Sequence, residues 1–91
     1  MIARRAVISG RVQGVGFRWH TQREARRLGV CGWVRNRHDS SVEVWMEGAQ
    51  ADVDELLVWL NKGPPLAAVN VLEVTEQSAA GSPDFAVKST R

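Results

Sequence analysis

The chain of 91 residues is short enough for one domain, and its 44% hydrophobic and 24% charged residues are ordinary for a globular protein. Its single cysteine, Cys31, excludes an internal disulfide, and no apolar run is long enough for a membrane span or a signal peptide. We therefore expect a cytoplasmic monomer without a membrane partner.

The net charge of +2 is unevenly distributed along the chain. Residues 1–38 contain nine arginines and one acidic residue, whereas residues 39–91 contain three basic and nine acidic residues. A basic first half would attract phosphate groups, either on a small molecule or on nucleic acid. A solvated surface of arginines is the alternative interpretation.

The first half of the chain predicts a strand, a helix and a hairpin. Alternating apolar and polar residues over 4–12 predict a strand, and a glycine-rich turn follows it. Residues 17–28 lack glycine and proline and carry apolar residues along one helical face, so we predict a helix that ends at Gly29. Residues 30–37 and 41–47 predict two strands of a hairpin, the second of them half-buried.

The second half predicts one more helix and two more strands. Leucine and valine spacing predicts a helix over residues 50–62, which stops at a Gly-Pro-Pro run. Residues 68–76 predict a strand, and residues 85–89 a short final strand. The order strand, helix, strand, strand, helix, strand predicts an α+β split βαβ sandwich, with a mostly antiparallel sheet and two helices on one face.

The stretch GRVQGVGFR, residues 10–18, is the motif that indicates chemistry. Glycine accepts left-handed backbone angles, and successive N–H groups in such a loop form an anion nest that the start of a helix extends. Arg18 would lie in the first helical turn, where its guanidinium can bind two phosphate oxygens. The loop therefore indicates a phosphate site, although glycine spacing alone also fits a tight turn beside a surface arginine.

The residues missing from this loop restrict the possible reaction. It contains no nucleophile, and on a helix His20 would point about 200° away from Arg18. No set of His, Cys, Asp and Glu has metal-ligand spacing, so we predict neither a metal nor another cofactor. An acyl phosphate suits so simple a site, because its leaving group is a carboxylate whose acid has a pKa of about 4.

GRVQGVGFR, followed by GWVRN at residues 32–36, resembles the acylphosphatases, and the match continues through VEVWMEG and GPPLAAV into FAV. It covers nearly the whole chain, so residues 1–91 are expected to form a single acylphosphatase-like domain. The resemblance implies a ferredoxin-like fold and hydrolysis of the carboxyl-phosphate bond of acyl phosphates.

The resemblance also implies the roles of individual residues. Arg18 would bind the phosphate, Asn36 would orient the attacking water, and the substrate phosphate would take the proton of that water. Inorganic phosphate or sulfate would bind at the same site. The phosphate would contact loop residues Gln13, Gly14, Val15, Gly16, Phe17 and Arg18.

Two departures from the family pattern stand out. Asp39-Ser40 occupies a turn in which the family often has Asp-Gly, and a left-handed serine would cost about 1 kcal/mol. Trp19-His20 replaces an aromatic pair, for which we expect only packing consequences.

Two other functions remain to be weighed. An RNA-recognition module can share this topology, but the predicted first strand has no aromatic residue and no RNP-like run is present, so we expect no nucleic-acid partner. A catalytically inactive acyl-phosphate sensor is the second alternative, and the presence of both Arg18 and Asn36 argues against it.

Overall fold

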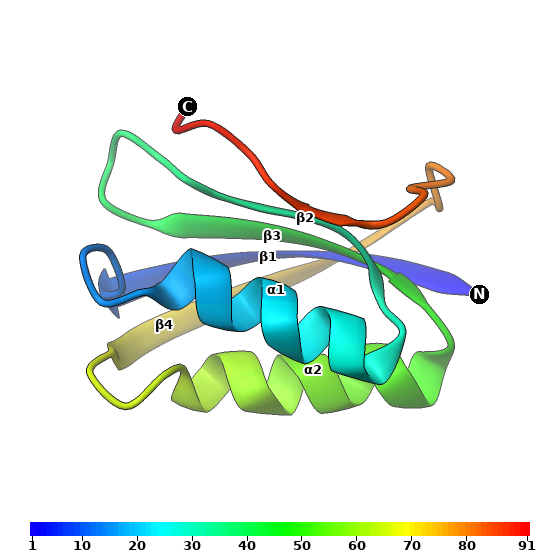
Figure 1. The fold of residues 1–91 in the computed structure, drawn as a ribbon, viewed down its shortest axis with the longest axis horizontal. Coiled ribbons are helices and arrows are strands. Elements are labelled where there is room, and N and C mark those ends of the chain that lie inside the picture. The colour runs from blue at the N-terminus through cyan, green and yellow to red at the C-terminus, as the bar shows by residue number, and fades with distance from the viewer.

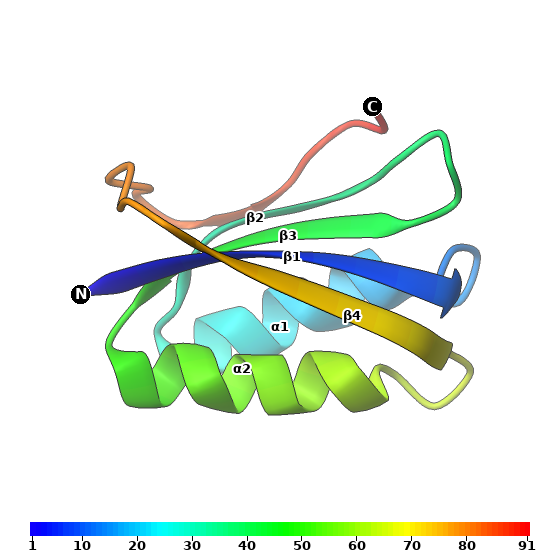
Figure 2. The same cartoon turned by 180° about the vertical axis from the view of Figure 1, so that it is seen from behind.

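The computed structural model describes all 91 residues as two layers, a five-stranded sheet and two helices that cover one of its faces (Figures 1 and 2). Neither helix is both long and apolar enough to cross a membrane. In chain order the elements are β1 (Ile2–Arg11), α1 (Phe17–Leu28), β2 (Cys31–Asn36), β3 (Val42–Gly48), α2 (Gln50–Lys62), β4 (Ala68–Gln77) and β5 (Phe85–Val87).

The sheet has the strand order β4-β1-β3-β2-β5. All neighbouring strands are antiparallel except β2 and β5, which run parallel. The predicted ferredoxin-like α+β sandwich is confirmed, and both helices have the predicted bounds. Strand ends differ by one or two residues from those predicted. Regular pairing of β5 stops at Val87, although the Lys88 amide still donates to the Val34 carbonyl oxygen at 2.9 Å.

The core lies between the helices and the sheet face that they cover. Alternation brings Ala6, Ile8, Val34, Val42, Val44 and Met46 to this face, and Phe17, Ala25, Val53, Leu56 and Leu60 meet them from the helices. Phe17 also packs against Trp59 of α2, with their ring centroids 5.9 Å apart. Because Phe17 begins α1, this burial fixes the rotation of the helix next to the glycine-rich loop.

The prediction that the strand over residues 41–47 is half-buried is wrong, because β3 is buried on both faces of the sheet. Glu43 and Glu47 point away from the helices, yet only 5% and 2% of their surfaces are exposed. Arg5 and Arg35 each donate a hydrogen bond from Nε to Glu43. A carboxylate can be buried when it is paired with a cation or fully hydrogen-bonded. The alternating glutamates of β3 therefore do not mark a face exposed to solvent.

Glu47 anchors the chain segment that leads from β4 to β5. Its carboxylate accepts hydrogen bonds from the Trp45 indole, the Ala80 and Gly81 amides, and both the amide and hydroxyl of Ser82. Burial by itself would raise the pKa of Glu47, but these hydrogen bonds, led by that of the Ser82 hydroxyl, lower it to about 2. The ionised carboxylate therefore stabilises the fold.

The turn between β2 and β3 keeps the shape that the family pattern implies. Ser40 has a φ of 75°, the left-handed conformation expected of glycine at this position. Asp39 Oδ1 accepts hydrogen bonds from the amide and hydroxyl of Ser41, and these bonds lower the pKa of Asp39. The side chain of Asp39 thus holds together a turn that serine alone would disfavour.

Glu47→Gln should reduce the free energy of unfolding by about 1–3 kcal/mol near pH 7, because an amide cannot satisfy all of the donors that face the carboxylate. The folded-state pKa of about 2 lies below the ordinary value of 4.5, so this stabilisation is present above pH 4.5 and disappears as the pH falls toward 2. Urea unfolding of both proteins between pH 7 and pH 3 measures the effect. Glu73→Gln, on exposed β4, is the matched control, and a loss that stays constant with pH would contradict this role for Glu47.

Candidate active site

The loop between β1 and α1 presents main-chain amides that have no acceptor in the protein. Gly14 and Gly16 both have a φ of 74°, and Gly16 caps the helix without a side-chain hydrogen bond. The amides of residues 13–16 donate no main-chain hydrogen bond, and the first amides of a helix have no intrahelical acceptor. The first turn of α1 also lacks acidic residues. This arrangement suits an anion.

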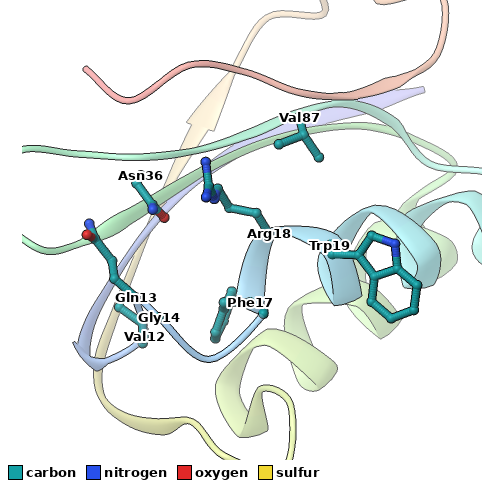
Figure 3. Close-up of a pocket in the computed structure, with 9 residues that line it drawn as sticks. Val12, Gln13, Gly14, Phe17, Arg18, Trp19, Asn36 and Val87 are labelled. Carbon is teal, nitrogen blue, oxygen red and sulfur yellow. The ribbon is translucent and has the colours of Figure 1, made fainter.

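Arg18 places a cation beside these amides. Its guanidinium has no carboxylate within ion-pair distance, unlike those of Arg5, Arg26 and Arg35. Figure 3 shows its side chain extending from the first turn of α1 toward Asn36, while Phe17 points the other way. The buried phenyl ring of one residue thus orients the guanidinium of the next.

Asn36 enters the site from the end of β2. It pairs with Val42 of β3, on the face of the sheet that the helices cover, and its side chain points into the same space as Arg18 (Figure 3). The main-chain carbonyl oxygen of Asn36 accepts a hydrogen bond from the Arg91 main-chain amide at 3.0 Å. The Arg91 carbonyl oxygen in turn accepts one from the His38 main-chain amide. Arg91 therefore holds the backbone at Asn36 and just after it.

Gln13 connects the loop to the turn that follows Asn36. Its side-chain amide donates to the carbonyl oxygens of Arg37 at 2.8 Å and Ser41 at 2.9 Å. The donor group of this side chain is therefore already used within the protein. Only the main-chain amide of Gln13 remains free to meet an anion, and the side chain serves to hold the loop beside Asn36.

These residues surround a pocket of about 410 Å³. Its lining contains no carboxylate, imidazole, thiol or hydroxyl side chain, and no three His, Cys, Asp or Glu side chains in the chain gather closely enough to hold a metal ion. Arg18 is the only charged residue of the lining, so the pocket is positive. The lining residues are Val12, Gln13, Gly14, Gly16, Phe17, Arg18, Trp19, Asn36 and Val87.

Most of the predicted site residues meet at this pocket. Val15 does not line it, and its side chain packs against the hydrophobic core. Sequence reasoning missed the core residue Val12 and, at the pocket mouth, Trp19 and Val87. Trp19 directly follows Arg18 on the helix, and this spacing does not indicate that both residues line the same pocket. Val87 reaches the pocket through its parallel pairing with Val34, which the sequence does not reveal.

Comparison with known proteins decides the family. The acylphosphatase family profile matches residues 4–87. The chain belongs to the acylphosphatase family. The acylphosphatase of Thermococcus kodakarensis is 52% identical over 88% of each chain. A solved acylphosphatase structure from Bacillus subtilis superposes with a TM-score of 0.94 at 37% identity, over 97% of this chain and 99% of that one. One from Coxiella burnetii gives a TM-score of 0.92 at 34% identity, over 96% and 92%.

The family assignment agrees with the chemistry of the pocket. The sequence resemblance to acylphosphatases is confirmed, and the chain is an enzyme of this family. The acylphosphatase motif residues Arg18 and Asn36 face one pocket although they are separated in sequence by a helix and a strand. The glycines that precede Arg18 shape the loop amides around the same space.

Arg18→Ala should weaken the binding of inorganic phosphate roughly 10- to 100-fold, the loss expected for hydrogen bonds from a charged donor. The rise in melting temperature with phosphate concentration measures this affinity, because a ligand that binds the folded state stabilises it. Arg27→Ala removes the same charge from the last turn of α1 and should leave the phosphate response unchanged. Equal responses of the wild type and Arg18→Ala would exclude Arg18 as a phosphate ligand.

Proposed function

We propose that this enzyme hydrolyses the carboxyl-phosphate bond of acyl phosphates by direct attack of water on phosphorus. The products are a carboxylate and inorganic phosphate. The observation that supports this most is the convergence of unpaired loop amides, Arg18 and Asn36 on a pocket that has no nucleophilic side chain. Membership of the acylphosphatase family supports the substrate class.

The phosphate is held by charge rather than by covalent chemistry. Amides of the loop and of the first turn of α1 donate hydrogen bonds to its oxygens, and the Arg18 guanidinium donates to further oxygens from the side of the helix. As the bond between phosphorus and the acyl oxygen lengthens, negative charge spreads over the same oxygens. Donors fixed by Gly14, Gly16 and the packing of Phe17 need no rearrangement at that moment, and this preorganisation lowers the barrier.

Asn36 holds the attacking water. Its carboxamide can accept a hydrogen bond from the water, which aligns the water with phosphorus. A carboxylate at this position would repel the phosphate, whereas the neutral amide does not. The pocket lining has no general base, so the water's proton passes to an oxygen of the substrate phosphate.

The leaving group explains why so few residues are needed. The electron pair of the broken bond goes to a carboxylate whose acid has a pKa of about 4, so the carboxylate leaves without a proton donor. An alkoxide from a phosphate monoester would need one. The amides and Arg18 supply the required positive potential, so the proposed reaction needs no metal, cofactor or partner subunit.

Asn36→Ala should lower kcat on benzoyl phosphate by roughly 10²- to 10³-fold, the scale of losing one preorganised polar contact. Its affinity for inorganic phosphate should stay near that of the wild type, because the amides and Arg18 remain. Asn61→Ala, in the exposed last turn of α2, is the matched control.

The same assay, run with p-nitrophenyl phosphate and with a metal chelator, tests the reaction class. We expect little cleavage of the monoester and full activity with the chelator. A wild-type kcat in Asn36→Ala would exclude the role of Asn36, and efficient monoester hydrolysis would exclude the proposed reaction.

A further inference from the structure

The candidate pocket has an apolar side that phosphate binding does not explain. Four of its lining residues are apolar, and two of them, Val12 and Phe17, belong to the buried core. The other two keep apolar surface in contact with solvent at the mouth, Trp19 with 54% and Val87 with 42% of their surface exposed. Figure 3 shows Val87 and Trp19 on the side of Arg18 opposite Asn36 and Gln13, with the Trp19 ring directed away from the loop.

Trp19 is exposed but held in place. The Arg23 guanidinium lies over its ring, 4.8 Å from the centroid, and the His20 ring meets it edge-on at 4.9 Å and 78°. Exposed tryptophans that are free to rotate lose side-chain entropy when a ligand binds, whereas a ring fixed by its neighbours loses less. Trp19 therefore presents a preorganised aromatic surface at the outer rim of the pocket, beyond Arg18.

Val87 is fixed by a different element. It belongs to the short edge strand β5 and pairs with Val34 of β2, which directs it toward the helix side of the sheet. Because β5 is at the margin of the sheet, α1 does not cover Val87 completely. A tryptophan from α1 and a valine from β5 thus meet the same pocket from two directions.

The position of the phosphate determines what these two residues contact. In an acyl phosphate the carbonyl carbon is joined to phosphorus through one oxygen, so the acyl group extends out of the cradle immediately beside it. The loop amides, Arg18 and Asn36 occupy the polar sides, which leaves the apolar side for that group. We infer that Trp19 and Val87 form an acyl-group subsite that favours aromatic acyl phosphates over small ones, an inference that rests on the proposed function.

Substitution of Trp19 tests this subsite with two substrates that share the phosphate and differ in the acyl group. For Trp19→Ala, we expect KM for benzoyl phosphate to rise about three- to tenfold, the range for an aromatic contact, while KM for acetyl phosphate changes less than about twofold. Trp19→Phe should restore most of the preference for the benzoyl group. Val87→Ala should act in the same direction, and Val58→Ala, 73% exposed on α2, should not.

A binding measurement separates this inference from the proposed reaction. Calorimetry with benzoylphosphonate and acetylphosphonate, which cannot be hydrolysed at a carboxyl-phosphate bond, should show the same preference and the same loss in Trp19→Ala. Equal affinities of the two phosphonates, or equal effects of Trp19→Ala on both, would overturn the acyl subsite. If the wild type binds benzoylphosphonate more tightly through Trp19 but cleaves neither acyl phosphate, the subsite stands and the proposed reaction fails.

Discussion

Main-chain amides between β1 and α1 have no acceptor within the protein, and the rest of the site is arranged around that constraint. Unpaired amides are tolerated only where water or a ligand reaches them, so this loop must remain at the surface. Gly14 and Gly16 supply the left-handed angles that aim successive amides, and the first turn of α1 extends the array. Two contacts hold the loop in place. Phe17 packs into the core at the end of the loop, and the Gln13 side chain at its start donates hydrogen bonds to the turn between β2 and β3.

Neighbouring residues in this loop divide structural and chemical tasks between them. Phe17 is buried so that Arg18 faces the pocket, and the Gln13 side chain is used internally while its backbone remains free. Asn36 faces the site because side chains alternate along β2, and its pairing with Val42 of β3 places it on the sheet face that the helices cover. The resulting site has one cation, a set of dipoles and a neutral amide, which matches a substrate that brings its own charge and its own good leaving group.

The fold and the glycine-rich loop were predictable because both depend on local patterns, whereas Asn36 was connected to that loop only through the family resemblance. Helical spacing fixed the bounds of α1 and α2, and the glycines with Arg18 marked the loop. The burial of β3 on both faces was not predictable, because a sequence pattern with Glu43 and Glu47 indicates a solvated face. These carboxylates are buried only because Arg5, Arg35 and the segment before β5 contact them in the folded structure. Trp19 and Val87 were missed for a similar reason, since their place at the pocket depends on a helix and an edge strand meeting in space.

The role of the loop amides can be measured directly by titrating inorganic phosphate into ¹⁵N-labelled protein and following the backbone amides by NMR. Hydrogen bonding to an anion shifts amide protons downfield. The amides of residues 13–18 should therefore shift together and saturate with one dissociation constant, while those in the last turn of α1 stay unchanged. Loop amides that remain at their positions at saturating phosphate, with shifts confined to exposed arginines elsewhere, would show that the anion is not held by this loop.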